Sequence, residues 1–263
     1  MAEAAGLYYE THGQPDAPPL ILSSGLGGSA SYWKPNIPAL AEHFHVIAYD
    51  HRGTGSSDRT PLVSPSVADM ADDVVALLDS LEIATSHFIG HALGGLIGLA
   101  LAARMRERVG RLVVVNGWGR LESHTARCFD ARLSLLRDSG VEAFVRAQPI
   151  FLYPANWIAL HADEIEEDEK IAIAHFPGAL TMEQRIAAAR AFDVNDWMNE
   201  VWTPVLVYST DDDMLVPSIA SLKLVESLEG MMTTQARAPT GGHACNVTDP
   251  DTFNRIVLDF LRS

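Results

Sequence analysis

Short hydrophobic runs alternate with helical patterns along the first part of the chain. The runs are continuous and rich in Ile, Leu and Val, which predicts buried strands. They lie at residues 19–24, 44–49, 86–89 and 111–115. Between residues 66 and 82 hydrophobic side chains recur at a spacing near 3.6, which predicts an amphipathic helix, and another is expected to end at about Arg106. Continuous apolar strands separated by helices favour a parallel sheet covered on both faces.

The pattern changes at about Gly117, where helical spacing replaces the strand–helix alternation. The sequence DEIEEDEK, residues 163–170, is a run of charges that indicates a solvated helix face. We therefore expect residues 117–200 to form a helical cap inserted between two strands. Insertions of this kind commonly form lids over active sites.

Strand character returns at residues 204–209, and more weakly near 231–237. A final amphipathic helix is predicted over residues 252–261. The expected organisation is an α/β core formed by residues 1–116 and 201–263, with the cap between its two parts. This is the pattern of a mostly parallel central sheet with helices on both faces.

The charge balance restricts the partners of this 263-residue chain. It has 34 acidic and 19 basic residues, for a formal net charge of −15. Such a surface repels phosphate polymers and anionic lipids, so we expect a small-molecule substrate and neither nucleic acid nor a membrane as partner. No cluster of Cys and His has zinc-ligand spacing, and no phosphate-binding glycine motif occurs, so no metal and no cofactor are expected.

Two cysteines cannot form a disulfide framework, and the first residues lack the pattern of a secretory signal. The longest uncharged apolar stretch, residues 88–103, is shorter than a membrane span and contains a His. We therefore expect a cytoplasmic protein. The sequence leaves a homodimer open.

Four segments carry candidate chemistry, and their order along the chain is informative. They are Gly90-His91-Ala92-Leu93-Gly94, Ser24-Gly25-Leu26-Gly27-Gly28, Asp211-Asp212-Asp213-Met214-Leu215-Val216-Pro217 and Gly241-Gly242-His243. The first has the form of a nucleophile elbow, a tight turn between a strand and a helix. Elbow, acid and histidine follow one another in the order of an α/β-hydrolase. The chain thus resembles that superfamily over nearly its whole length.

Within this pattern, the backbone N–H groups of Leu26 and Leu93 are expected to form an oxyanion hole. His243 is the candidate general base, and the acid that orients it lies among Asp211 to Asp213. If Ala92 occupies a true elbow, its φ angle must be positive, and the strain costs about 1–3 kcal/mol.

Further segments are similar to the RutD family, hydrolases of bacterial pyrimidine breakdown. These segments are residues 116–118, 124–129, 147–155 and 241–250. The resemblance implies a hydrolase of carbamate, or in another assignment of aminoacrylate. It also implies that Asp213, which matches D-x-x-V-P, is the acid, with Asp212 as the alternative. The family motif itself admits Ala in G-H-A-L-G.

Ala92 stands where the superfamily has Ser, Cys or Asp, and its methyl group cannot form a covalent intermediate. A His243–Asp213 dyad can still activate water for a labile substrate. Two alternatives remain open. One is a serine hydrolase whose nucleophile has been removed by mutation, and the other is a non-catalytic homologue that binds a ligand.

A carbamate or small carboxylate needs a local cation in so acidic a protein. Arg120, His124 and Arg127 are spaced by three or four residues, which predicts one helix face. Arg127 is the first candidate for the substrate anion and Arg120 the second. The alternative is that these arginines lie at the surface or in ion pairs.

Overall fold

The computed structural model describes residues 2–60, 64–196, 201–228 and 232–263. Its centre is an eight-stranded sheet with the strand order β1-β2-β4-β3-β5-β6-β7-β8. The strands are β1 Ala2–Ala4, β2 Leu7–His12, β3 Pro19–Ser23, β4 His45–Tyr49, β5 Ser86–His91, β6 Val109–Val115, β7 Val205–Thr210 and β8 Thr233–Ala238. The strands predicted from hydrophobic runs are therefore confirmed; residue 231 of the last one lies outside the described residues.

The six strands from β3 to β8 pair in parallel, whereas β1 and β2 are antiparallel additions at one edge. These two strands were not predicted from the sequence. Most residues of β2 are half-buried, because the strand lies near the edge of the sheet. An edge strand of this kind lacks the continuous hydrophobic run by which buried parallel strands were recognised.

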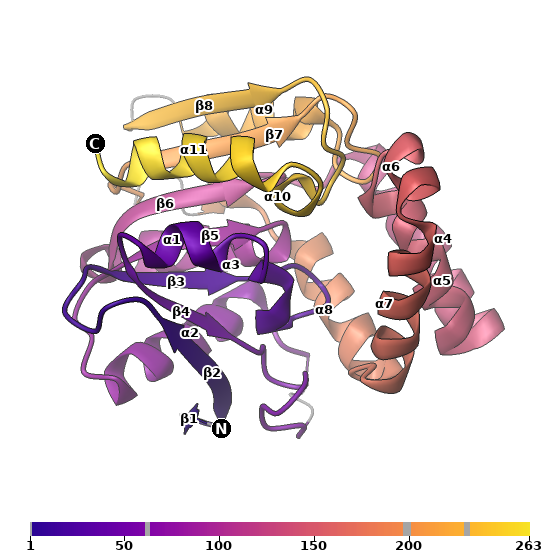
Figure 1. Ribbon diagram of the computed structural model, residues 1–263, viewed down its shortest axis with the longest axis horizontal. Helices are drawn as coiled ribbons and strands as arrows, with labels where there is room; N and C mark the ends of the chain where they lie inside the picture. Colours follow the sequence, from indigo (N-terminus) through magenta and orange to yellow (C-terminus); the bar gives the residue numbers. More distant parts are fainter. Residues whose placement is uncertain (1, 61–63, 197–200, 229–231) are drawn as a thin grey trace.

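Helices cover both faces of the sheet, as expected (Figure 1). In β3, Leu20 and Leu22 point to one hydrophobic cluster and Ile21 to the other, following the two-residue period of a strand. The core helices are η1 Ala30–Trp33, α1 Ile37–Ala41, α2 Val67–Ser80, α3 Leu93–Arg104, η2 Arg106–Arg108, α9 Ser218–Ser227, α10 Cys245–Thr248 and α11 Pro250–Leu261. No helix in the described ranges is long and apolar enough to cross a membrane.

Between β6 and β7 the chain forms helices that lie beyond the carboxyl ends of the parallel strands (Figure 1). They are α4 Ser123–Ser134, η3 Leu135–Ser139, α5 Gly140–Leu152, α6 Ala155–Leu160, α7 Ala162–Ala174, α8 Ala179–Ala191 and η4 Val194–Asp196. We call these helices the cap; residues 197–200 of the expected insertion lie outside the described residues. Buried cap residues such as Phe129, Phe144 and Ile186 join the same hydrophobic cluster as Ala92 and Leu96 of the core. The cap therefore packs on the edge of the sheet at which strands end and chemistry is expected.

Candidate active site

Ala92 occupies the turn between β5 and α3 with φ 47° and ψ −112°. A positive φ at a residue with a Cβ atom is strained, so the sequence prediction of an elbow is confirmed. The Ala92 amide donates to the carbonyl of Val115 at 2.8 Å, which fixes the turn to the neighbouring strand β6. The side chain is 6% exposed and belongs to the hydrophobic cluster.

The glycines at either end of the elbow are required by close backbone approach. A Cβ atom on Gly90 would lie 2.2 Å from the carbonyl oxygen of Gly94. A Cβ atom on Gly94 would lie 2.1 Å from the carbonyl oxygen of Ser23, at the end of β3. Neither position can accept a side chain without moving backbone, so the turn depends on both glycines.

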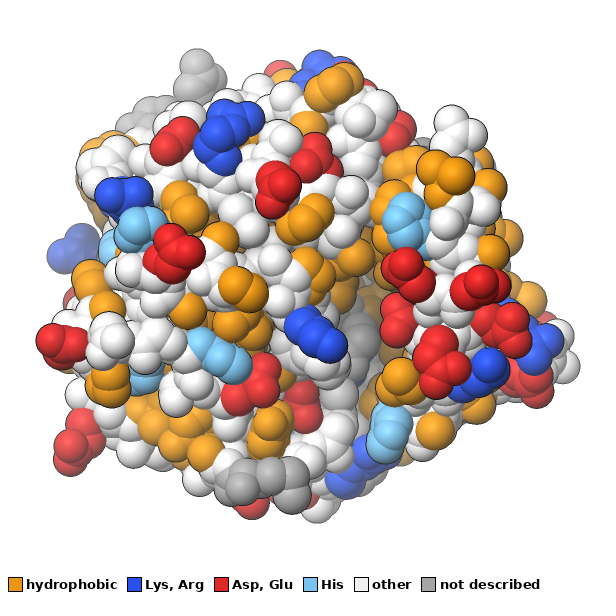
Figure 2. Space-filling model, viewed as in Figure 1, with side chains coloured by type: hydrophobic (Ala, Val, Ile, Leu, Met, Phe, Trp, Pro, Cys, Tyr) orange, Lys and Arg blue, Asp and Glu red, His pale blue; other side chains and the backbone are white. Residues whose placement is uncertain are grey.

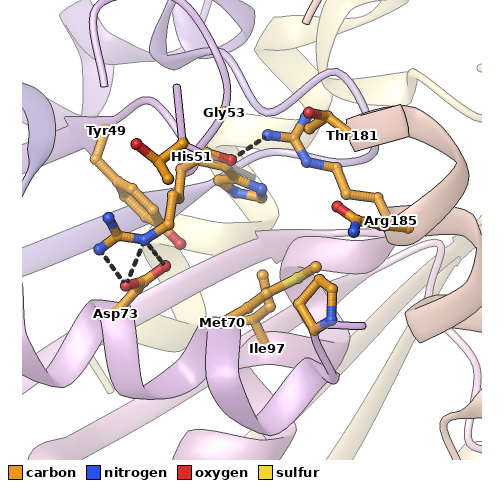
Figure 3. Close-up of a pocket in the computed structure, with 12 residues that line it drawn as sticks. Tyr49, His51, Gly53, Met70, Asp73, Ile97, Thr181 and Arg185 are labelled. Carbon is orange, nitrogen blue, oxygen red and sulfur yellow. Dashed lines mark hydrogen bonds and ion pairs between the residues drawn. The ribbon is translucent and has the colours of Figure 1, made fainter. Parts of the chain in front are cut away.

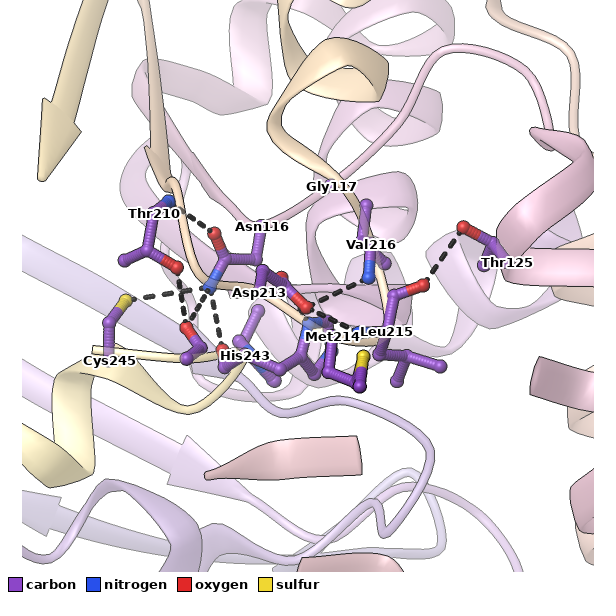
Figure 4. Close-up of polar contacts among 12 residues, drawn as sticks. Asn116, Gly117, Thr125, Thr210, Asp213, Met214, Leu215, Val216, His243 and Cys245 are labelled. Atoms are coloured by element: carbon purple, nitrogen blue, oxygen red, sulfur yellow. Dashed lines mark hydrogen bonds and ion pairs between the residues drawn. The ribbon is translucent and has the colours of Figure 1, made fainter. Parts of the chain in front are cut away.

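His243 and Asp213 form a buried pair at the ends of two segments that are distant in sequence (Figure 4). The Nδ1 atom of His243 lies 2.7 Å from the Oδ2 atom of Asp213. The other carboxylate oxygen accepts the amides of Leu215 and Val216, each at 2.8 Å. Asp213 is thereby fixed by its own loop and orients the imidazole, so that Nε2 is the nitrogen left for other chemistry.

Asp212, the alternative acid, has a different position. Its carboxylate accepts the amides of Gly241 and Gly242 at 3.3 and 2.8 Å and so holds the histidine loop by its backbone. Asn116 donates from Nδ2 to the carbonyl of His243 at 2.7 Å, and Thr210 donates to that of Gly242 at 2.7 Å (Figure 4). The loop that carries the imidazole is therefore anchored to the ends of β6 and β7.

His91, the residue before Ala92, connects the elbow to the histidine loop. Its Nε2 atom lies 2.9 Å from the carbonyl oxygen of His243, and the two rings have centroids 4.6 Å apart. Burial holds the pKa of His91 well below its ordinary value, so the ring is neutral and donates this hydrogen bond. This hydrogen bond ties the backbone of His243 to the residue that precedes Ala92.

The loop after β3, where an oxyanion donor was predicted, lies against the elbow. A Cβ atom on Gly25 would approach the His91 ring to 3.1 Å. The amide of Leu26 donates to no protein group in the described part of the chain, and Leu93 is the first residue of α3, where amides have no partner within the helix. Both predicted donors are thus free, on two segments in contact with each other.

Arg185 of α8 holds this loop from the cap side, a role that the sequence analysis missed. Its guanidinium donates to four oxygen atoms, namely the carbonyls of Leu26, Gly27 and Arg52 and the hydroxyl of Thr54. Figure 3 shows Arg185 reaching toward the loop that follows β4, beside a cavity of about 30 Å³. Residues Ala92, Asp213 and His243 are not part of the lining of that cavity.

The first cap helix, α4, is attached to the acid loop. Thr125 donates to the carbonyl of Leu215 at 3.0 Å, and the Nε2 atom of His124 lies 2.8 Å from the carbonyl of Met214. His124 therefore fixes the cap to the segment that contains Asp213. These contacts bring the buried face of α4 toward the His243–Asp213 pair.

The structure does not gather the other two predicted anion-binding residues at this site. The expectation that Arg120 shares a helix face with His124 and Arg127 is wrong, because α4 begins only at Ser123. The side chain of Arg120 is 77% exposed, and its Nε atom lies 3.7 Å from the Oδ2 atom of Asp193. Arg127 is on the exposed side of α4 and donates to the carbonyl of Ser123 in its own helix. Their exposure favours the surface alternative.

The space-filling view shows a hollow between core and cap in which hydrophobic side chains gather (Figure 2). Exposed acidic side chains of α7 face solvent on the cap, as the charge run predicted. Trp118 is 2% exposed, and its ring centroid lies 6.2 Å from that of Phe129 in α4. The aromatic residues at the start of the insertion thus join core to cap beside the acid loop.

Comparison with known proteins is consistent with this geometry. The α/β hydrolase fold family matches residues 18–250. An enol-lactonase from Burkholderia xenovorans LB400 superposes with a TM-score of 0.87 at 27% identity, covering 98% of this chain and 96% of its own. The meta-cleavage product hydrolase CumD from Pseudomonas fluorescens IP01, as a serine-to-alanine mutant complexed with acetates, gives a TM-score of 0.82 at 27% identity, covering 98% and 96%.

Curated relatives named RutD are more similar in sequence, at 44% to 49% identity. They are provisionally assigned as carbamate hydrolases. The RutD of Agrobacterium fabrum is 46% identical over 257 residues, which cover 97% of this chain and 98% of that protein. Identity at this level over the core and the cap confirms the resemblance found in the sequence. The chain therefore belongs to the RutD family of α/β-hydrolases.

Proposed function

We propose that this hydrolase cleaves the C–N bond of carbamate, or of the imine tautomer of aminoacrylate, without a covalent intermediate. The observation that carries the proposal is the buried His243–Asp213 pair beside an elbow whose central residue, Ala92, offers only a methyl group. The names of the RutD relatives supply the substrate class. Acetate, with which the CumD mutant is complexed, has the shape and charge of carbamate.

In the proposed reaction, Nε2 of His243 takes a proton from a water molecule. The water oxygen forms a bond to the carbamate carbon. The developing oxyanion accepts hydrogen bonds from the backbone N–H groups of Leu26 and Leu93. The imidazolium then returns the proton to the nitrogen, the C–N bond breaks, and ammonia and bicarbonate are released. The buried Asp213 carboxylate stabilises the imidazolium during this cycle.

A cytoplasmic location remains part of the proposal, since both cysteines are free and buried.

The expected rate gain fits a labile substrate. General-base catalysis contributes about 10²–10⁴-fold, and one oxyanion donor about 10²–10³-fold. Such factors are small for a stable amide but sufficient for a molecule that decomposes unaided. The missing nucleophile and the proposed substrate class therefore agree.

The test is ammonia release from freshly prepared carbamate, measured rapidly and corrected for spontaneous decay. We expect His243→Ala to lose about 10²-fold or more of the catalysed rate, and Asp213→Asn to lose a comparable factor. His175→Ala, which removes an exposed histidine at the end of α7, is the matched control. A catalysed rate unchanged by His243→Ala removes the dyad from the mechanism.

A second variant tests the oxyanion loop separately. Ala92→Ser supplies a hydroxyl at the elbow, and we expect it to gain hydrolysis of small activated esters if the amides of Leu26 and Leu93 are correctly placed. Absence of ester hydrolysis in a folded Ala92→Ser protein argues against the oxyanion hole. The non-catalytic alternative instead predicts ligand binding with no turnover in any of these proteins.

A further inference from the structure

Arg132 is a buried positive charge in the cap that has no carboxylate partner. The residue lies on α4 and is 4% exposed. One of its terminal nitrogens donates to the side-chain carbonyl of Gln148 on α5. Its Nε and Nη1 atoms are buried and have no hydrogen-bond partner, and it takes part in no ion pair within the described residues. Two of the three nitrogens of the guanidinium therefore have unused donors.

Aromatic rings surround the guanidinium instead of acids. Its central carbon lies 6.0, 5.5 and 5.7 Å from the ring centroids of Phe129, Phe144 and Phe151. Burial lowers the pKa of Arg132 to about 10, which still leaves it charged at neutral pH. Ring faces attract a cation but do not replace a counter-ion, so the unpaired charge costs stability. An anionic ligand would offset this cost.

The guanidinium lies on the same helix face that contacts the acid loop. Thr125, Cys128, Phe129 and Arg132 form the buried side of α4, and Thr125 bonds the carbonyl of Leu215. Seven residues of helix separate Thr125 from Arg132, or about 10 Å along the axis. A long arginine side chain that leans toward the start of its helix shortens this separation.

Cys128 gives a second indication of proximity. Burial raises the pKa of its thiol; the positive charge of Arg132 opposes this rise and the negative charge of Asp213 adds to it. The Sγ atom of Cys128 lies 3.7 Å from the carbonyl oxygen of Met214, the residue after Asp213, and Cys128 shares the buried face of α4 with Arg132.

Trp118 supplies another unused donor in the same region. Its Nε1 atom is buried without a hydrogen-bond partner, and its ring packs against Phe129, one of the rings around Arg132. Phe129 thus packs against both the Trp118 indole and the Arg132 guanidinium, and each of these groups has an unused N–H donor. The three phenylalanine rings around Arg132 belong to, or pack against, the hydrophobic cluster that contains Ala92.

We propose that Arg132 binds the carboxylate of the substrate, with the Trp118 indole as an additional donor, and so selects small planar anions. The identity of the reacting end rests on the proposed function, whereas the anion subsite rests on Arg132 itself. Either unused nitrogen of Arg132 can donate to a carboxylate oxygen, and the charge of the guanidinium attracts an anion but not a neutral amide of equal size.

The experiment is thermal unfolding in sodium acetate, the isostere of carbamate, at constant ionic strength adjusted with sodium chloride. Neutral acetamide is the ligand control. We expect acetate at about 100 mM to raise the Tm of the wild type by about 3 °C or more, and acetamide to leave it unchanged. Arg132→Met is expected to lose the acetate shift. Arg146→Met, which removes an exposed arginine of α5, is expected to keep it.

An equal acetate shift in Arg132→Met, or no shift in the wild type, overturns the proposal. Arg132→Lys provides a second variant that keeps the charge but not the guanidinium donors, and it should retain less than half of the shift. The measurement requires no turnover, so a His243→Ala protein should still show the full acetate shift. Loss of activity with an intact shift, or the reverse, therefore distinguishes failure of the proposed reaction from failure of the subsite.

Discussion

The cap contains two buried arginines whose surroundings differ sharply. Arg132 and Arg185 are 4% and 2% exposed, and burial lowers the pKa of each to about 10. Arg185 donates to four oxygen atoms of the core loops. Arg132 donates to one amide oxygen and otherwise faces aromatic rings. Burial alone therefore does not reveal what a charged side chain does; its unused donors do.

The satisfied arginine acts within the fold, and the unsatisfied one is available to a ligand. Arg185 uses its donors on backbone carbonyls and so positions the loop that carries Leu26. Removing it leaves the half-buried carbonyls of Leu26 and Arg52 without this donor, which costs more than the hydrogen bonds contribute on average. Removing Arg132 eliminates an unpaired charge, a change that is often neutral or stabilising. The two residues should thus respond in opposite directions to the same substitution.

The largest effect is expected for Arg185→Met. We expect the free energy of unfolding to fall by about 2–4 kcal/mol, since carbonyl groups of the core loops lose their donor. The catalysed rate should fall by about tenfold or more, because the displaced loop carries a proposed oxyanion donor. Urea denaturation and ammonia release measure the two effects.

Arg190→Met on the same helix is the control for Arg185→Met. Arg190 pairs with Asp130 at the surface, and its loss should cost about 1 kcal/mol or less. Arg132→Met should leave the free energy of unfolding unchanged or raised. Equal destabilisation by Arg132→Met and Arg185→Met would contradict the distinction between the two sites.

The sequence was sufficient for the features that depend on local geometry. The elbow at Ala92, the parallel strands and the hydrophobic face of the helix after residue 66 follow from residues adjacent in the chain. His243 and Asp213 could be paired because the carboxyl ends of parallel strands meet at one edge of the sheet. The choice of Asp213 over Asp212 needed the family motif, since both are at the end of β7.

The anion-binding residue could not be selected in the same way. Arg132 and Arg185 are two of sixteen arginines, and which of them is buried depends on how the cap helices pack. Arg127 lies three residues after His124, a spacing that predicts neighbours on one helix face. It nevertheless lies on the exposed side of α4. A helical periodicity across Thr125, Cys128, Phe129 and Arg132 was the available signal, because three uncharged residues at that spacing mark the buried face.

Buried histidines differ from the two buried arginines, because a histidine can lose its charge at neutral pH and an arginine cannot. Burial holds the pKa of His51 and His91 well below 6.5, so the unfolded chain binds more protons than the folded one as the pH falls below that value. We expect the free energy of unfolding to decrease between about pH 7 and pH 5.5, by up to about 1.4 kcal/mol per pH unit for each histidine.

Urea denaturation at the two pH values checks this expectation. His91→Gln retains a donor for the carbonyl of His243 and removes one titrating group, so its pH dependence should be shallower than that of the wild type. Arg132→Met should retain the wild-type slope, because its pKa lies far above this range. Stability that stays constant or rises toward pH 5.5 would show that these rings are not held neutral by the fold.

The smallest change in stability, and the sharpest test of the comparison, is expected for Gln148→Glu. Gln148 donates to the carbonyl of Phe144 at 2.6 Å and accepts from Arg132. A carboxylate in its place loses the first bond but gives the guanidinium an internal counter-ion, so the two effects should offset to within about 1 kcal/mol. Arg132 then resembles Arg185, a charge already satisfied by the protein.

The substitution should therefore abolish the Tm shift caused by acetate while leaving the protein folded. Gln148→Met is the matched control: it removes the amide partner without adding a charge, so the acetate shift should persist or increase. If Gln148→Glu shows the same acetate shift as the wild type, the anion binds elsewhere. If both variants lose the shift, the amide of Gln148, and not an unpaired charge on Arg132, governs binding.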